Sequence, residues 1–219
     1  MFGFTVAVRK TWHPDATMRL QNAVHESGPW RIHAIVPDFT LEDVWALPAQ
    51  GGAEDFPKLL ELGTSLDPAN ADSWPARALW RIRDRLGAWF DLGRISEPDD
   101  GSQTLPIPGT NETSLAGRLP DDLRESRWDH DFGSLPFKPL YRTDTESAAE
   151  ISNKTVHGVM HLAWADQGGG RFQGQMAVYV KPRGAFGTAY MAFIRPFRYL
   201  IVYPALMRQV ERRWEASQA

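Results

Sequence analysis

The chain has 219 residues, of which 42% are hydrophobic and 23% charged, as is usual for a soluble globular protein. It contains no cysteine, which excludes disulfides, thiolate nucleophiles and cysteine-ligated metal sites. The formal net charge of −3 gives no general attraction to nucleic acid, so we expect no nucleic-acid partner. The absence of cysteine is compatible with a reducing cytoplasm, which is the location we expect.

Two apolar stretches raise the question of a membrane. The run Phe2–Val8 is short and follows no basic region, so it does not resemble a signal peptide. The stretch 189–207 is strongly apolar, but its longest uncharged run, Tyr199–Met207, contains Pro204. A spanning helix needs about 20 apolar residues. We therefore predict no transmembrane segment.

The first half of the chain predicts one strand and two helices after an N-terminal extension, residues 1–37. Residues 34–48, "AIVPDFTLEDVWALP", show a broken alternation that is typical of a strand. Residues 53–63 and 73–93 place their apolar residues at helical spacing, and a glycine follows each run. The segment at about 94–138 is acidic and rich in proline and glycine, which predicts a long loop.

From Leu140 the pattern changes to β. Asn153–Lys154 and Asp166–Gly170 each separate two apolar runs, which predicts two hairpins. A third hairpin is predicted around Pro182–Gly184, with its second strand running into a C-terminal helix at Pro196. Pro204 should kink that helix, because proline removes a backbone hydrogen bond.

This order of elements resembles the helix-grip fold of the START-like (SRPBCC) superfamily, and "MAFIRPFRYLIVYPAL" and "NKTVHGVMHLAW" resemble an uncharacterised bacterial family of unknown function with that expected fold. The resemblance covers roughly residues 38–214. It implies an α+β domain, residues 38–219, whose curled antiparallel sheet surrounds the C-terminal helix. In that fold the space between sheet and helix is the usual ligand cavity. The family has no established activity to carry over.

His157 and His161 lie four apart on a predicted strand, so both side chains point to one face. Their Cα atoms should be about 13 Å apart, too far to chelate one metal ion together. Glu146 and Glu150 precede them across the predicted hairpin and could orient an imidazole for acid–base chemistry. A cross-strand ion pair meets the same description. His157, His161 and Glu150 are therefore the candidate catalytic residues, and no metal site is predicted.

The expected ligand residues are in the last strands and the terminal helix. Gln175 and Tyr179 alternate with an aliphatic set that looks like core, which places Tyr179 outside or at a rim. Under the helix-grip hypothesis, we expect these two residues to share a cavity with Tyr190, Phe193, Phe197 and Ile201. Arg195 and Arg198 fit an anion clamp or ion pairs with the acidic loop.

Three functional hypotheses follow. The leading one is that the protein binds a small, mostly apolar molecule between the sheet and the C-terminal helix. The second is an enzyme that uses His/Glu acid–base chemistry in the same cavity, and the third is an interaction protein whose core is filled by its own side chains. Homodimerisation through an exposed sheet edge is compatible with all three. No GxGxxG motif follows a strand, so we expect no dinucleotide and no other cofactor.

Overall fold

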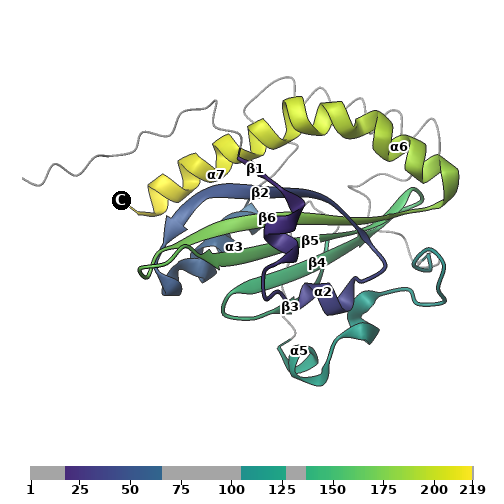
Figure 1. Ribbon diagram of the computed structural model, residues 1–219, viewed down its shortest axis with the longest axis horizontal. Helices are drawn as coiled ribbons and strands as arrows, with labels where there is room; N and C mark the ends of the chain where they lie inside the picture. Colours follow the sequence, from purple (N-terminus) through teal and green to yellow (C-terminus); the bar gives the residue numbers. More distant parts are fainter. Residues whose placement is uncertain (1–17, 66–104, 127–136, 219) are drawn as a thin grey trace, which may run out of the picture.

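The protein is an α+β domain with one antiparallel sheet and a long C-terminal helix (Figure 1). The computed structural model describes residues 18–65, 105–126 and 137–218. Within these ranges the strands are β1 (Arg19–Leu20), β2 (Thr40–Gly51), β3 (Lys138–Arg142), β4 (Glu146–Ser152), β5 (Val156–Asp166) and β6 (Phe172–Pro182). The helical segments are α1 (Asn22–Glu26), α2 (Ile32–Ile35), η1 (Ala53–Asp55), α3 (Phe56–Ser65), η3 (Leu115–Arg118), α5 (Asp121–Glu125), α6 (Gly184–Phe197), η4 (Arg198–Val202) and α7 (Tyr203–Ser217).

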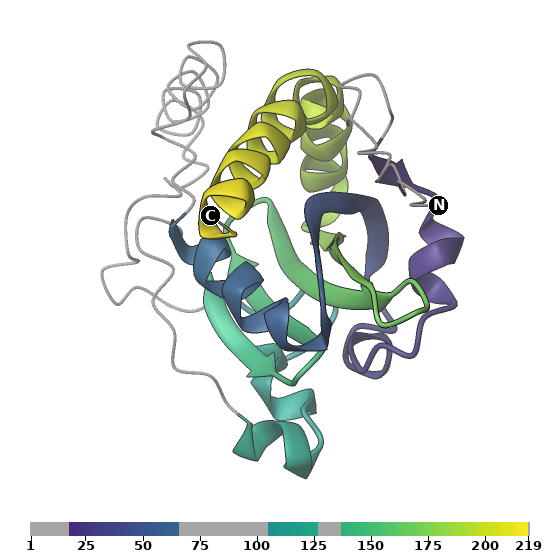
Figure 2. The same ribbon diagram turned by 90° about the vertical axis from the view of Figure 1, so that its left-hand side faces the viewer.

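The sheet has the strand order β1-β2-β6-β5-β4-β3, and every neighbouring pair is antiparallel. Both predicted hairpins, β4–β5 at Asn153 and β5–β6 at Asp166–Gly170, are confirmed. The strands curve beneath the long helix (Figure 2). The helix predicted at residues 53–63 is confirmed as α3, whereas the one predicted at residues 73–93 lies outside the described residues.

The third predicted hairpin is wrong. Residues 184–197 form helix α6 rather than a returning strand, so the chain leaves β6 directly into a helix that continues to Ser217. Gly184 adopts a positive φ of 63° at this corner, a conformation that glycine takes without steric cost. The following "AFGTAYMAF" suggested a strand because its aromatic residues recur, but its alanines and methionine are good helix formers.

The long helix is not uniform. Pro196 lies inside α6 rather than in a first turn, and the next residues, Arg198–Val202, form a π-helical segment. Proline cannot donate a backbone hydrogen bond, and a wider π turn is one way in which a helix accommodates such an interruption. Pro204 follows the π-helical segment directly within the continuous helix, so its missing N–H removes a donor to the carbonyls of that segment.

Aromatic side chains pack in the space between the sheet and the long helix. Trp45 of β2 lies 4.5 Å from Tyr203 of α7 between ring centroids, and Trp164 of β5 lies 5.8 Å from Trp214. Helix α3 adds Phe56 to the same buried cluster. The helix-grip hypothesis expects a ligand between the sheet and the long helix. Where α7 covers the sheet, this region is filled by packed aromatic side chains.

The opposite face of the sheet is also covered. The segment that contains α1 and α2, residues 21–36, packs on it beside the described part of the acidic loop, residues 105–126. The buried residues of this second cluster include Ile32, Ile35, Ile107, Leu115, Leu119 and Leu123. Because both faces are covered, Tyr179 is buried rather than at a rim, which corrects the expectation from the alternation in β6.

The long helix is anchored to β2 through a buried carboxylate. Asp43 is fully buried at a register shift in β2 and accepts hydrogen bonds from Arg198, Tyr199 and Tyr203. The Tyr203 hydroxyl lies 2.8 Å from Asp43 Oδ2 and 2.8 Å from an Arg198 nitrogen. Arg198 therefore pairs with β2 rather than with the described part of the acidic loop.

Candidate functional site

Two buried histidine–glutamate pairs lie side by side on the sheet face that is turned away from the long helix. Nε2 of His161 is 2.8 Å from Glu146 Oε2, and Nε2 of His157 is 3.0 Å from Glu150 Oε2. Each glutamate on β4 is diagonal to its histidine on β5, because Ala148 is directly opposite His161 and Ser152 is opposite His157. The expected pairing across this hairpin is thus confirmed.

Glu146 joins the sheet to the segment that covers it. Its carboxylate accepts hydrogen bonds from the backbone N–H of Arg31 at 2.9 and 3.1 Å and from the Tyr141 hydroxyl at 3.0 Å. Burial alone would raise the pKa of Glu146, but these donors and His161 outweigh it and hold the pKa below its ordinary value. Glu146 is therefore an ionised carboxylate inside the protein.

Glu150 is buried like Glu146 and also accepts several hydrogen bonds, but from other donors. The Ser114 hydroxyl donates to Oε1 at 2.5 Å and the Leu115 N–H to Oε2 at 2.9 Å, both from the described part of the acidic loop. Burial raises the pKa of Glu150, yet the hydrogen bonds from His157 and these groups leave it lowered overall. Each glutamate thus joins one covering segment to the sheet by hydrogen bonds: Glu146 joins residues 21–36, and Glu150 joins residues 105–126.

His161 is a neutral imidazole with one free nitrogen. Burial lowers its pKa, and Glu146 opposes this only in part. A neutral ring whose Nε2–H donates to an ionised carboxylate carries a lone pair on Nδ1. Within the described residues, Nδ1 of His161 has no hydrogen-bond partner. His161 can therefore accept a proton or a hydrogen bond at this atom.

Further polar side chains with unmet hydrogen bonds surround His161. The ring of His25 is the centre of the group: its centroid is 5.1 Å from His161, 5.4 Å from His33 and 5.9 Å from Tyr179. Nine residues in the described part of the chain have buried polar atoms that lack a hydrogen-bond partner. Three of them, Trp45, His157 and Arg198, lie elsewhere. The other six lie here: His25, Trp30, His33, His161, Gln175 and Tyr179. We call these six side chains the polar cluster.

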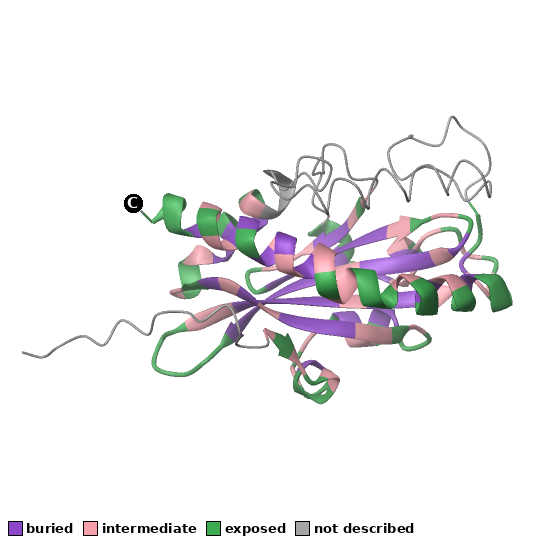
Figure 3. Cartoon of the chain, turned by 90° about the horizontal axis from the view of Figure 1, so that it is seen from above, coloured by how far each residue is buried: buried purple, intermediate pink, exposed green. Residues whose placement is uncertain are grey.

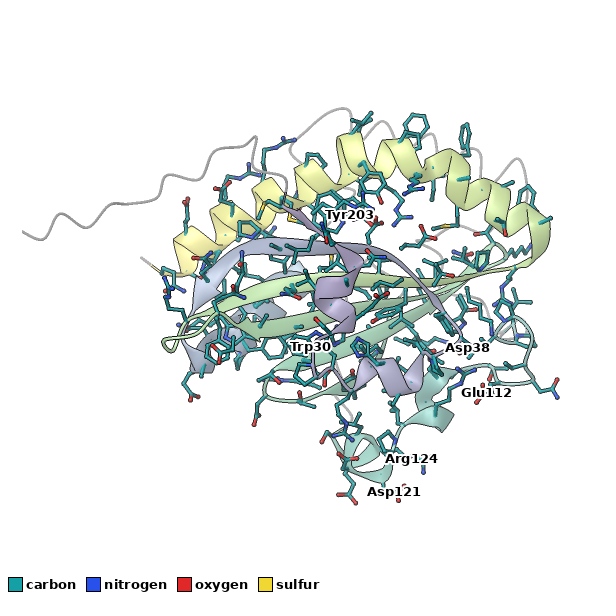
Figure 4. The ribbon with its side chains drawn as sticks, viewed as in Figure 1. Trp30, Asp38, Glu112, Asp121, Arg124 and Tyr203 are labelled. Atoms are coloured by element: carbon teal, nitrogen blue, oxygen red, sulfur yellow. The ribbon has the colours of Figure 1, made fainter. Side chains whose placement is uncertain are left out.

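The polar cluster comes from two parts of the chain. His161, Gln175 and Tyr179 project from β5 and β6, whereas His25, Trp30 and His33 come from the covering segment, residues 21–36. Figure 4 shows Trp30 by this segment and Tyr203 beneath the long helix, with the strands between them. Burial and the neighbouring imidazoles His161 and His33 lower the pKa of His25 to about 3, against an opposing contribution from the nearby Gln175 side chain, so His25 is neutral at pH 7.

The predicted ligand residues do not lie together. Gln175 and Tyr179 belong to the polar cluster, but Tyr190, Phe193, Phe197 and Ile201 belong to the long helix on the other side of the sheet. Phe193 and Phe197 are exposed, with 62% and 38% of their surface accessible. The ligand role of all these residues stays a prediction, but they cannot all line one cavity.

A shallow groove is lined by Arg31, the neighbour of Trp30 in the chain, but by none of the six side chains of the polar cluster. Its volume is about 590 Å³, and its lining also includes Asp122, Leu123 and Thr143. Arg31 forms an ion pair with Asp122 at 2.8 Å. The backbone of Arg31 also contacts Glu146, as does Thr143. The groove therefore reaches the residues that hold the His161–Glu146 pair.

The family described as "Protein of unknown function (DUF2867)" matches residues 35–205, more than three quarters of the chain. The chain belongs to the DUF2867 family. No curated protein matches the chain, and no solved structure matches it. The DUF2867 match includes both histidine–glutamate pairs, Gln175 and Tyr179, and it begins after His25, Trp30 and His33. Half of the polar cluster thus lies on the DUF2867 sheet, and the other half precedes the matched region.

Among the described residues of this DUF2867 chain, no three His, Asp or Glu side chains are arranged to hold a metal ion. In the same ranges, no helix combines the length and apolar character that crossing a membrane requires. Sequence reasoning missed His25, Trp30 and His33 because they carry no recognisable spacing. It also missed Asp43, for which a signal existed, since this charge adjoins the apolar Val44 and Trp45 in a strand.

Proposed function

We propose that the protein binds a small, polar, non-anionic organic molecule at the polar cluster, between the sheet and residues 21–36. The observation that carries this proposal is the concentration of buried polar atoms without partners around His25 and His161. Folded proteins satisfy the great majority of such atoms, and each one left unpaired costs about 1–3 kcal/mol. A ligand that supplies the missing hydrogen bonds would explain why so many unpaired polar atoms lie in one place.

The chemistry of the cluster supports a ligand with both hydrogen-bond donors and acceptors. Gln175 offers its Oε1, and the neutral imidazoles of His25 and His161 each offer one ring nitrogen as an acceptor. The Trp30 N–H, the other ring nitrogen of neutral His25 and the Tyr179 hydroxyl can donate, so the ligand also needs acceptors. The ionised carboxylate of Glu146 lies next to His161, which favours a neutral or cationic ligand and disfavours a phosphate or carboxylate.

The covering segment gives this site an entrance. Residues 21–36 are joined to the sheet through the Arg31–Glu146 hydrogen bonds and to α5 through the exposed Arg31–Asp122 ion pair. Exposed ion pairs contribute about 0–1 kcal/mol, so this contact opens at little cost. The groove beside Arg31 marks the side from which a ligand would approach.

The proposed site differs from the apolar cavity expected beneath the long helix. The fold itself remains consistent with the START-like helix-grip class, because a curled antiparallel sheet is combined with a long C-terminal helix. We therefore also propose that the protein has a START-like fold. The aromatic packing of Trp45, Trp164 and Trp214 beneath the helix favours placing the ligand on the opposite face.

Native mass spectrometry of gently purified protein tests the proposal. We expect a small-molecule adduct that is released on denaturation and is absent from the Gln175→Met variant. Gln209→Met, which changes a buried glutamine of α7 on the other side of the sheet, is the matched control and should keep the adduct. A variant Gln175→Met that retains the same adduct would place the ligand elsewhere, and an adduct-free wild-type protein would contradict binding.

Acid–base catalysis at the same place is the second candidate. The observation that favours it is the free Nδ1 of His161, whose ring is oriented by Glu146 as a general base requires. If the adduct is a substrate, His161→Gln should abolish its conversion while the adduct still forms. Equal loss of binding and conversion would leave His161 as a binding residue alone.

A further inference from the structure

Helix α6 presents an apolar surface to solvent. Phe186, Phe193 and Phe197 are exposed by 55%, 62% and 38%, and Leu200 in the adjoining η4 by 77%. At 3.6 residues per turn, the three phenylalanines lie on one side of α6. Ala185, Ala189 and Ala192 extend this exposed surface. Figure 3 shows exposed residues along most of α6, in contrast to the more mixed α7.

This pattern differs from that of an ordinary surface helix, because α6 is apolar on both its inward and its outward side. A helix that packs on a protein usually turns its apolar side inward and exposes charged residues. In α6 the inward residues Gly187 and Met191 are buried, yet the outward side is also apolar. The single charged residue of α6, Arg195, lies about 180° around the helix from Phe186. Exposed apolar residues that are contiguous in this way indicate a surface for interaction.

The charges around α6 indicate the kind of partner. From residue 167 to residue 210 the chain contains no Asp or Glu. Of the basic residues in this stretch, Lys181 and Arg198 are already paired with Asp38 and Asp43. The guanidinium groups of Arg19 and Arg195 lie 4.8 and 5.8 Å from the Tyr199 ring centroid, just beyond α6. Neither forms an ion pair with a carboxylate of residues 18–65, 105–126 or 137–218.

We propose that α6 and η4 dock on an anionic lipid surface, with the phenylalanines and Leu200 in the headgroup–acyl boundary and Arg19 and Arg195 on the lipid headgroups. An apolar side opposite a cationic one is typical of helices that lie in a membrane interface. A second copy packed on α6 would bring no carboxylate from its own residues 167–210 to pair with these arginines, which disfavours that occupant. The net charge of −3 for the whole chain makes such docking local to this surface.

Co-sedimentation with vesicles tests this. We expect the protein to bind vesicles of phosphatidylglycerol mixed with phosphatidylcholine, and to bind phosphatidylcholine alone much less. The double variant Phe193→Ser/Phe197→Ser should lower binding to the anionic vesicles by at least about tenfold, since it removes two inserted rings. Arg19→Gln/Arg195→Gln should weaken binding and reduce its dependence on salt.

Val24→Ser is the matched control, because Val24 is an exposed apolar residue (48%) of α1, far from α6 in the sequence. It should bind as the wild type does. No binding to anionic vesicles, or equal binding by the double phenylalanine variant, would overturn the proposal. A dimer in light scattering that the double variant converts to a monomer would assign the surface to a second copy instead.

Discussion

The carboxylate of Glu146 accepts hydrogen bonds from the backbone N–H of Arg31, which precedes it by 115 positions in the chain. Through this contact a strand of the sheet holds the segment that covers it. The same carboxylate orients His161, so the attachment of the covering segment and the orientation of the His161 imidazole depend on one side chain.

Glu146→Gln is expected to loosen the covering segment. The amide keeps one acceptor oxygen, but its NH₂ meets donors, and hydrogen bonds to a charged group are worth about 1.5–3 kcal/mol each. We expect the free energy of unfolding to fall by about 2–4 kcal/mol in urea titrations. Limited proteolysis should cut residues 21–36 faster. Glu125→Gln in the exposed α5 should change neither measurement, and an unaltered Glu146→Gln would contradict the role of this contact.

His25→Phe is expected to stabilise the protein. Both ring nitrogens of His25 are buried and have no partner in the described residues, so an apolar ring removes a desolvation cost of about 1–3 kcal/mol. If the polar cluster is a ligand site, this gain in stability comes with loss of the adduct. A less stable variant would show that the nitrogens are satisfied in solution.

The stability of the wild type should fall as the pH is lowered from about 6.5 toward about 3. The folded-state pKa of His25, about 3, lies below its ordinary value of 6.5, so in this window the unfolded chain binds a proton that the folded chain does not. His25 alone contributes a slope of at most about 1.4 kcal/mol per pH unit. His25→Phe should remove this part of the slope and leave the part due to His161, whose pKa is also lowered. Identical pH profiles for variant and wild type would contradict the buried neutral state.

Asp43→Ala should be among the most destabilising single changes. It leaves Arg198 and Tyr203 buried without their acceptor, and breaking a buried ion pair costs about 3–5 kcal/mol. The neighbouring Glu42 is a matched control, because its oxygen lies 3.9 Å from Arg198 and the residue is partly exposed. Glu42→Ala should cost less than about 1 kcal/mol in thermal unfolding. Equal losses for the two variants would show that Asp43 does not anchor the helix.

Gly187→Ala should destabilise the protein although alanine is the better helix former. A Cβ at Gly187 would lie 2.3 Å from the backbone oxygen of Thr155, in the β4–β5 turn. The gain in helix propensity is about 1 kcal/mol, whereas overpacking against backbone costs about 1–3 kcal/mol or more. Gly117→Ala is the control, since nothing lies within 4 Å of its Cβ position. A higher melting temperature for Gly187→Ala would contradict the close approach of α6 to this turn.

The sequence was informative where local chemistry determines structure. Asn153 and the glycines at 168–170 predicted the two hairpins. The period-2 spacing of a strand correctly placed the side chains of His157 and His161 on one face of the sheet. The diagonal partners Glu150 and Glu146 follow from the register that the Asn153 turn imposes. These features depend on neighbours within one hairpin, so a single sequence carries them.

Contacts between distant segments were not predictable in this way. Nothing in "NAVHESGPWRIH" indicates that His25 meets His161, because the contact depends on how residues 21–36 pack on the sheet. The strand predicted before Pro196 failed for a related reason. Its aromatic residues suit a strand or an exposed helix equally, and only the tertiary setting decides between them.

The π turn at Arg198–Val202 sets α6 and α7 out of phase, since it adds about one residue, or roughly 100° of rotation, to an otherwise α-helical path. Deleting one residue within it would restore a continuous α-helix, but α6 would rotate relative to α7. Met191 would then leave the sheet while Tyr203 and Trp214 kept their places. The length of this short segment, more than its composition, therefore fixes which side of α6 faces outward, and a single-codon deletion there would be more damaging than most substitutions.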